Sequence, residues 1–167
     1  MNPVHRTRRI GRRFSWILLG LVLLLPDTAH PDTESSNYKR FIASAGHYAN
    51  ALAAHRRGEL ERAEKSYLEA LERDPELVEA HVNLARIELD RGAFGAAESH
   101  LDQAAVQRPG YPAVYLVRGL VAARKGDHGR AVEAFERARQ LTPDDPELLT
   151  NLGATLLERG SLAEARS

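Results

Sequence analysis

The stretch that decides the fold is "RRGELERAEKSYLEALERDP", residues 56–75. Thirty-four residues later the chain reads "DRGAFGAAESHLDQAAVQRP", residues 90–109, and after another thirty-four "RKGDHGRAVEAFERARQLTP", residues 124–143. A fourth copy begins as "ERGSLAEARS", residues 158–167. A fixed period of this length is the signature of a repeat protein, in which each repeat is one supersecondary unit.

Small residues and proline keep this 34-residue register in five columns. A glycine adopts the left-handed conformation that ends a helix, so the glycine column closes a first helix of about 14 residues. Proline cannot continue a helix, so its column closes the second. The other columns mark places where two antiparallel helices cross closely. The columns are Gly58, Gly92, Gly126 and Gly160; Ala63, Ala97, Ala131 and Ala165; Ala70, Ala104 and Ala138; Pro75, Pro109 and Pro143; and Ala51, Ala85, Gly119 and Gly153.

Bulky residues fill the gaps between the small ones. In the first repeat Leu60, Tyr67 and Leu71 share one helical stripe. One helical hairpin cannot bury this stripe alone, so an all-α solenoid of stacked hairpins is predicted. The predicted helices cover residues 43–57 and 60–73, 76–91 and 94–107, 112–125 and 128–141, then 146–159 and an unfinished helix from 162.

The order of small residue, glycine, alanine, aromatic or leucine, alanine and proline resembles the tetratricopeptide repeat (TPR) family. The resemblance covers residues 44–167 and implies a right-handed α-solenoid of helix-turn-helix hairpins. It divides a TPR domain, residues 43–167, into three full repeats and a truncated fourth. The repeats are 44–77, 78–111, 112–145 and 146–167.

The first 29 residues are typical of a secretory signal. Five arginines precede a run of twelve weakly polar to apolar residues, 14–25. Such a run spans about 18 Å as a helix, short of the roughly 30 Å of a bilayer core. We therefore expect an exported protein, either periplasmic after cleavage or anchored in the inner membrane through residues 14–25 and facing the periplasm. Residues 30–42 are turn-rich at first and are predicted to form a flexible spacer that gains helical character near Tyr38.

The composition limits the classes of function that this protein can have. Apolar residues make up 43% of the chain and aromatic residues only 6%, which suits helices built from leucine and alanine. With the five N-terminal arginines set aside, 18 basic side chains remain against 23 acidic ones. This acidic balance argues against nucleic-acid binding, which needs charges that neutralise phosphate.

No catalytic motif stands out in the sequence. There is no cysteine, no phosphate-binding glycine loop and no nucleophile elbow. His47 and His81 occupy equivalent positions in adjacent repeats, about 10 Å apart as neighbouring helices are, whereas metal ligands lie about 2 Å from one ion. Acidic residues such as Asp144 and Asp145 stand at helix starts, where they cap the helix. We expect no enzyme, no cofactor and no metal.

The TPR resemblance implies a concave groove, lined by the first helices of successive repeats, that holds a protein or peptide. Some apolar members of this lining can instead belong to the core between repeats. Of the positions that clamp a terminal carboxylate in chaperone-binding relatives only Asn83 matches, while Ala113 and Val117 replace the basic pair. Apolar residues beside arginines suit a peptide with apolar and acidic residues. Carried over by position, the lining is Tyr48, Leu52, His55, Arg56, Val82, Asn83, Arg86, Asp90, Leu116, Leu120, Arg124, Thr150 and Asn151.

Three functions remain open from the sequence. The leading one is a non-enzymatic scaffold or assembly factor in the cell envelope. The second is the N-terminal recognition arm of a larger enzyme, such as a glycosyl- or sulfotransferase, cut off after residue 167. The third is self-association, because the truncated last repeat leaves apolar residues such as Leu152 and Leu156 without a capping helix.

Overall fold

A computed structural model describes residues 31–164 of the chain, and the side chains of residues 35–160. The chain divides into two units, residues 1–37 and 38–167. The described part of the first unit is the beginning of one helix, and the second unit holds the repeats. The predicted signal or anchor, residues 1–29, lies outside the described residues.

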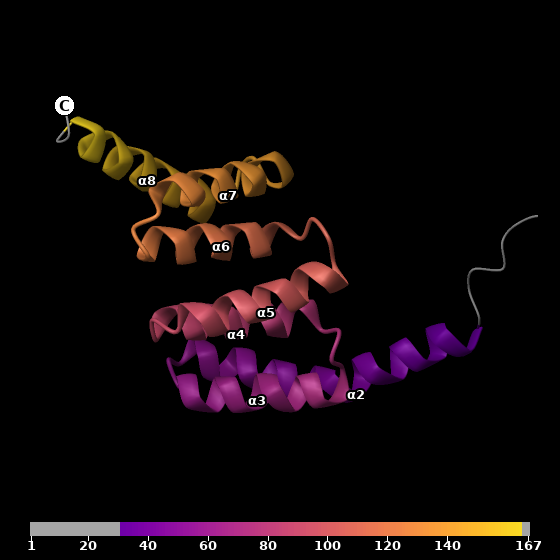
Figure 1. The fold of residues 1–167 in the computed structure, drawn as a ribbon. Helices are drawn as coiled ribbons and strands as arrows, with labels where there is room; N and C mark the ends of the chain where they lie inside the picture. Colours follow the sequence, from indigo (N-terminus) through magenta and orange to yellow (C-terminus); the bar gives the residue numbers. More distant parts are fainter. Residues whose placement is uncertain (1–30, 165–167) are drawn as a thin grey trace, which may run out of the picture. The chain divides into compact units, whose positions relative to one another are not determined.

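Across the described residues, all regular structure is α-helical, which confirms the predicted all-α helical repeat solenoid (Figure 1). In the second, third and fourth repeats, the first helix packs against the second helix of the preceding repeat. In the second and third repeats, the first helix also packs against the second helix of its own repeat. The first helices of the second, third and fourth repeats also contact one another in order. The helices are α2 (Pro31–Arg56), α3 (Leu60–Arg73), α4 (Val78–Asp90), α5 (Phe94–Gln107), α6 (Pro112–Arg124), α7 (His128–Leu141) and α8 (Pro146–Glu164).

Glycine closes the first helix of three repeats, as the sequence predicts. Gly58, Gly92 and Gly126 have φ angles of 73°, 75° and 77°. This left-handed conformation carries a strain for any residue with a Cβ. The residue after each glycine then donates its backbone N–H back into the helix that has just ended, for example Asp127 to the Ala122 carbonyl at 2.9 Å.

The second helix of each of the first three repeats ends three residues after the alanine column, at Arg73, Gln107 and Leu141. The backbone N–H groups of Asp74, Arg108 and Thr142 donate to the carbonyls four residues earlier, at 2.9, 3.0 and 2.9 Å. Those carbonyls belong to the alanines at 70, 104 and 138, and a proline follows each capping residue. The proline one residue beyond each cap lacks an N–H and cannot continue the helix.

The small columns are the tightest part of the core. Ala63, Ala97 and Ala131 are completely buried, and the alanine seven residues after each is at most 1% exposed. Tyr67 and Phe135, from the stripe of bulky residues, are also fully buried. Small residues at the crossings allow the helices to approach closely, and the large rings fill the remaining space.

The start of the first helix differs from the prediction. Residues 30–42 were expected to form a flexible spacer, but α2 begins at Pro31 and runs without a break to Arg56. Proline is well tolerated at the first position of a helix, because its missing N–H would have no partner there. After Pro31 the sequence contains no proline or glycine before Gly46, so nothing local interrupts the helix.

The end of the last helix also differs. The glycine column predicted a turn at Gly160 and a new helix from 162, but α8 continues through Gly160 to Glu164. The three glycine turns are each followed by a 14-residue helix that packs back on the first. In the described residues no such helix follows Gly160, and α8 continues through that position. Within residues 31–164, no helix is both long and apolar enough to cross a bilayer.

Candidate functional site

Two pockets lie one after the other along α6. The first, which we call the Arg86 pocket, has a volume of about 240 Å³. The second, the Arg124 pocket, has a volume of about 190 Å³. The Arg86 pocket is lined by Arg86, Tyr111, Pro112, Ala113, Leu116, Ala138, Thr142, Asp145, Glu147 and Leu148. The Arg124 pocket is lined by Leu120, Ala123, Arg124, Phe135, Asn151, Ala154, Thr155 and Glu158.

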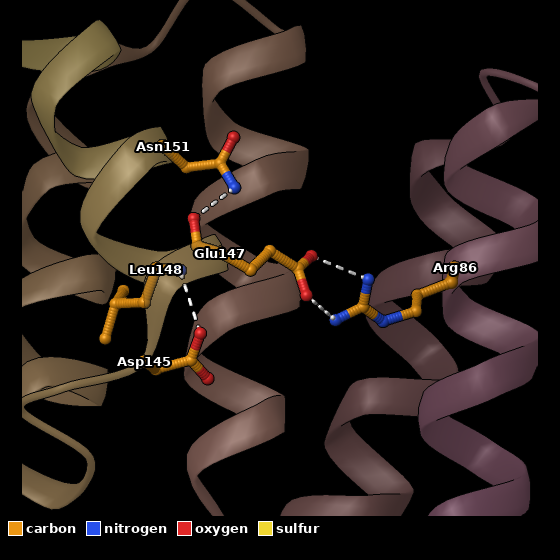
Figure 2. A network of polar contacts seen from close by, with 5 residues as sticks. All are labelled: Arg86, Asp145, Glu147, Leu148 and Asn151. Carbon is orange, nitrogen blue, oxygen red and sulfur yellow. Dashed lines mark hydrogen bonds and ion pairs between the residues drawn. The ribbon is translucent and has the colours of Figure 1, made fainter.

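A bidentate ion pair joins two walls of the Arg86 pocket (Figure 2). The Arg86 Nη1 and Nη2 atoms donate to the two carboxylate oxygens of Glu147, at 2.8 and 3.2 Å. The partners are 61 positions apart, on the first helices of the second and fourth repeats. Parallel bonds of this kind between guanidinium and carboxylate are stronger and more directional than a single neutral hydrogen bond.

Local hydrogen bonds hold the turn of α8 that carries Glu147. The Asp145 Oδ1 atom accepts from the backbone N–H of Leu148 at 3.1 Å, and the Leu148 side chain is fully buried. The Asn151 Nδ2 atom donates to the Glu147 carbonyl at 2.8 Å (Figure 2). The capping aspartate satisfies a backbone donor that the helix start leaves open. The Glu147 carboxylate therefore extends from an ordered first turn toward α4.

The Arg124 pocket carries a cation that has no ion-pair partner among the described residues. Arg124 is exposed, and no carboxylate among the described residues lies within ion-pair distance of it. Leu120, half-buried, is one helical turn before it, and Glu158 lines the opposite side. Glu158 lies 3.3 Å from the Nδ1 atom of His128. This pocket thus offers an apolar wall next to an available guanidinium.

A chain of polar contacts lies beside the Arg86 pocket. The Asn83 Nδ2 atom donates to the Tyr48 hydroxyl at 3.2 Å and to the Glu79 carbonyl at 2.9 Å. Burial, with the negative charge of Glu79 second, raises the pKa of Tyr48. The Glu79 carboxylate accepts from Arg108 at 2.7 Å, and the guanidinium of Arg108 lies 4.8 Å from the centre of the Tyr111 ring. Both donor hydrogens of the Asn83 amide nitrogen therefore have acceptors within the chain.

Five of the thirteen predicted groove residues line the two pockets. Three residues come from α6, and α4 and α8 supply one each. The five are Arg86, Leu116, Leu120, Arg124 and Asn151.

The other predicted residues lie elsewhere. Tyr48 and Leu52 are partly buried and pack on the core between the first two repeats, and Val82 is 5% exposed in the next core cluster. The His55 Nδ1 atom lies 3.3 Å from the Tyr67 hydroxyl. These four, with Asn83, serve packing and internal hydrogen bonds.

Three exposed residues of the predicted lining border neither pocket. Arg56 and Asp90 are at the last residues of α2 and α4. The Thr150 hydroxyl donates to the Pro146 carbonyl at 2.8 Å, which is a local bond within α8. Their equivalent positions in the repeats led to the prediction, but register alone does not decide which turn of a helix faces a pocket.

Sequence reasoning missed Glu147 and most of the walls of the Arg86 pocket. Glu147 reads as an ordinary acidic residue in the first turn of a helix. Its partner is two repeats away, whereas the repeat register relates residues of adjacent repeats. Ala113, noted only as a replacement for a basic residue, proves to line this pocket.

The histidines pair within the chain in a way that the sequence did not indicate. The Nδ1 atoms of His81 and His100 lie 3.2 Å apart, and the His81 Nε2 atom lies 3.2 Å from the Pro75 carbonyl. Burial lowers the pKa of both rings, and His81 lowers that of His100 further. His47 instead pairs with Glu69 at 3.0 Å. In the described part of the chain no three potential ligands are grouped to hold a metal ion.

Comparison with known proteins shows relatives that are mostly much longer than this chain. Cellulose synthase 1 operon protein C of Komagataeibacter xylinus is 31% identical over 110 residues, which are 65% of this chain and 8% of that protein. The chain spans less than a third of the length of each curated relative compared.

Solved structures share the fold. An O-GlcNAc transferase mutant of Thermobaculum terrenum superposes with a TM-score of 0.67 at 23% identity, over 71% of this chain and 23% of that one. The first TPR of Spaghetti (RPAP3), bound to an HSP90 peptide, superposes with a TM-score of 0.64 at 19% identity, over 71% of this chain and 94% of that one. The family model described as tetratricopeptide repeat matches residues 48–112 and 116–167, most of the chain. Together with the glycine turns and the buried alanine columns, this match shows that the chain belongs to the tetratricopeptide repeat family.

Proposed function

We propose that this chain is a non-enzymatic peptide-binding module that acts as a scaffold or assembly factor in the cell envelope. A segment of a partner protein lies along α6 and enters both pockets. The observation that carries the proposal is the placement of Leu116, Leu120 and Arg124 at intervals of four residues on one face of α6, with the two pockets along it.

The chemistry of the two pockets suits a peptide with apolar and acidic side chains. Leu120 and the small exposed part of Leu116, which is 5% exposed, supply an apolar floor. Arg124 offers a guanidinium that has no ion-pair partner among the described residues. Buried apolar anchors beside an arginine are the features that dominate binding energy at protein interfaces. The structure of the RPAP3 domain with its HSP90 peptide supports the proposal only as an example of a peptide bound by the same fold.

Peptide selection on the full chain tests this proposal. Peptides selected from a random displayed library are expected to bind the wild-type protein and to lose at least about tenfold in affinity for the double variant Leu120→Glu, Arg124→Glu, because a buried anchor and its cation both contribute about 1 kcal/mol or more. Arg130→Glu is the matched control, because its side chain on α7 is 80% exposed and lines neither pocket. Equal affinity of the folded double variant would refute the assignment of the groove to α6.

The envelope location rests on the N-terminal sequence. The arginine-rich start and the apolar run of residues 14–25 support export, and a relative named for a bacterial cellulose synthase operon agrees with a bacterial setting. An alkaline phosphatase fusion after residue 167 is expected to be active in a bacterial host, because that enzyme needs the oxidising periplasm. A full-length fusion that stays in the cytosolic fraction and is inactive would exclude export.

A second candidate function is a recognition arm of a larger enzyme. The specific observation in its favour is the similarity to part of the Thermobaculum transferase, where this chain covers 23% of that one. The intact mass of the protein purified from its natural source separates the two. A mass near 18.5 kDa, or lower by a signal peptide, supports the module, and a much larger mass supports the arm.

The exposed face of α8 supports self-association as an additional property. Leu149, Leu156 and Leu157 are all exposed there, and an apolar helix face of this kind usually has a partner. Light scattering on a sizing column is expected to give a mass that rises with concentration for the wild type. Leu156→Glu is expected to keep the mass at that of one chain, and a constant wild-type mass would exclude self-association.

A further inference from the structure

The most informative contact outside the proposed peptide contacts is the ion pair between Arg86 and Glu147. It occurs inside a pocket that otherwise has an apolar floor at Leu116 and a small residue, Ala113. The pocket volume of about 240 Å³ is several times the roughly 30 Å³ of a water molecule, so it accommodates part of a side chain. Among the described residues, Arg86 is the one cationic side chain that lines this pocket, and it is already paired with the Glu147 carboxylate of the same chain.

We propose that Glu147 is an internal competitor for the Arg86 pocket. In the free protein its carboxylate occupies Arg86, and a glutamate or aspartate side chain of a bound peptide displaces it and takes over both hydrogen bonds. The pocket therefore selects an acidic side chain, with a neighbouring apolar one on Leu116, and Glu147 lowers the affinity for it. This inference rests on the proposed peptide-binding function.

Displacement of Glu147 is energetically feasible. The side chains of Arg86 and Glu147 are 30% and 47% exposed, so water screens the pair, and its contribution lies in the low range of surface ion pairs. A released Glu147 carboxylate stays in the first turn of α8, where the helix dipole favours a negative charge. The released group therefore needs no new partner.

Arg86 depends on the ion pair more strongly than Glu147 does. In the part of the chain that the structure describes, Glu147 is the one acidic side chain within ion-pair distance of its guanidinium. The other acid of the pocket is Asp145, and its Oδ1 atom already accepts from the backbone N–H of Leu148. Asp145 and a displaced Glu147 would both repel an incoming acid. Removal of the Glu147 charge therefore reduces repulsion and frees Arg86 at the same time.

If the Arg86–Glu147 ion pair only braces the repeats, the opposite change in affinity is expected. The pair connects the second and fourth repeats, so a brace that shapes the groove would bind peptide less well once it is broken. A competitor that is removed leaves a site that binds more tightly. The sign of the change in affinity for Glu147→Gln therefore distinguishes the two roles.

The experiment uses the full chain and two short acetylated, amidated and fluorescein-labelled alanine-based peptides. One carries leucine and glutamate, and the other has glutamine at each glutamate position. Fluorescence anisotropy gives the affinities of the wild type, Glu147→Gln, Arg86→Gln and Glu133→Gln. Glu133 is the matched control, because it is an exposed glutamate on α7 that lines neither pocket.

Glu147→Gln is expected to bind the glutamate peptide about three- to tenfold more tightly than the wild type does, the range that about 0.7 to 1.4 kcal/mol corresponds to. Its affinity for the glutamine peptide and the affinities of Glu133→Gln are expected to stay unchanged. Arg86→Gln is expected to prefer the glutamate peptide less than the wild type does, with the remaining preference due to Arg124. Circular dichroism establishes that each variant keeps its helices.

Two other outcomes overturn the inference in distinguishable ways. Unchanged or weaker binding of the glutamate peptide by Glu147→Gln, with binding still lost in the Leu120→Glu, Arg124→Glu variant, rejects the competitor and leaves the groove in place. Absence of binding by either peptide to the wild type and to Glu147→Gln rejects both the competitor and the proposed groove.

Discussion

The ring of Phe135 occupies the space that a side chain at Gly119 would need. A Cβ atom built at Gly119 would collide with the ring of Phe135, which is fully buried. Gly119 is on α6 and Phe135 on α7, so the two helices of the third repeat cross at this point. The first and second repeats have Ala51 and Ala85 at the equivalent position, both completely buried.

Gly119→Ala is therefore expected to lower the free energy of unfolding by about 1 to 3 kcal/mol, the usual cost of forcing an extra methyl group into a packed core. The loss occurs although alanine is the better helix former. Urea unfolding followed by circular dichroism measures it.

Gly153→Ala is the matched control on α8. It is the next member of the same column, and a Cβ atom there meets no neighbour within 4 Å. This variant is expected to gain up to about 1 kcal/mol from helix propensity alone. A stability of Gly119→Ala equal to or above that of Gly153→Ala would show that the close crossing does not exist in solution.

The His81–His100 pair is expected to make stability depend on pH. Burial lowers the pKa of both rings in the folded protein, so the folded state binds fewer protons than the unfolded state near the unfolded pKa of about 6.5. The contribution of the pair to the free energy of unfolding is therefore fully present above that pH. It declines as the pH falls through the lowered pKa values of the folded state. Glu64 and Glu88 act on His100 in the opposite direction and soften the decline.

Urea midpoints measured from pH 8 down to pH 5 test this dependence. The wild type is expected to lose stability over the lower half of the range, and His100→Gln to lose less, since one buried titrating ring is gone. His55→Gln is the control, because His55 contacts the Tyr67 hydroxyl and lies outside the pair. Parallel curves for the wild type and His100→Gln would contradict the assignment.

Asp145→Ala is expected to cost about 1 kcal/mol of stability, because it removes the side-chain acceptor for the backbone N–H of Leu148 at the start of α8. Asp144→Ala is the matched control. The Asp144 carboxylate is exposed and makes no hydrogen bond or ion pair with a described residue. Thermal unfolding of the two variants measures the difference. Equal melting temperatures would rule out the cap.

Tyr67 is expected to ionise only at strongly alkaline pH. Burial raises its pKa to about 12, so the protonated ring is favoured in the folded state. Its contribution to stability is complete below the unfolded pKa of about 10 and is lost as pH rises toward 12. The absorbance change of phenolate formation measures this step, and Tyr67→Phe removes it. The same late step in Tyr67→Phe would assign it to another residue.

Much of the fold is predictable because the repeat columns carry local information. Gly58, Gly92 and Gly126 allow a backbone conformation that ends a helix, and prolines stop the next one. The bounds of α3, α5 and α7 agree with the predicted ones to the residue. The prediction failed at the two ends. A polar, turn-rich stretch without a period predicted a spacer at residues 30–42, where α2 begins at Pro31. At Gly160 the column predicted a turn, but α8 continues and no second helix follows in the described residues.

The groove is less predictable, because the 34-residue register predicts the same lining positions in every repeat. Tyr48 and Asn83 occupy groove positions in the sequence, yet they hydrogen-bond to each other beside the core. Leu120 and Arg124 do line a pocket, because they lie on the side of α6 that faces α8. Which turn of a helix borders a pocket depends on how adjacent repeats stack.

The sequence by itself determined the helical hairpin, its period and its close crossings, since turns and small contacts depend on residues near one another in the chain. The tertiary structure alone decided that Arg86 binds Glu147. Their side chains are 61 positions apart and meet only because the third repeat sets the spacing of α4 and α8. Such a contact has no local signal, because its energy is available only after three repeats have stacked.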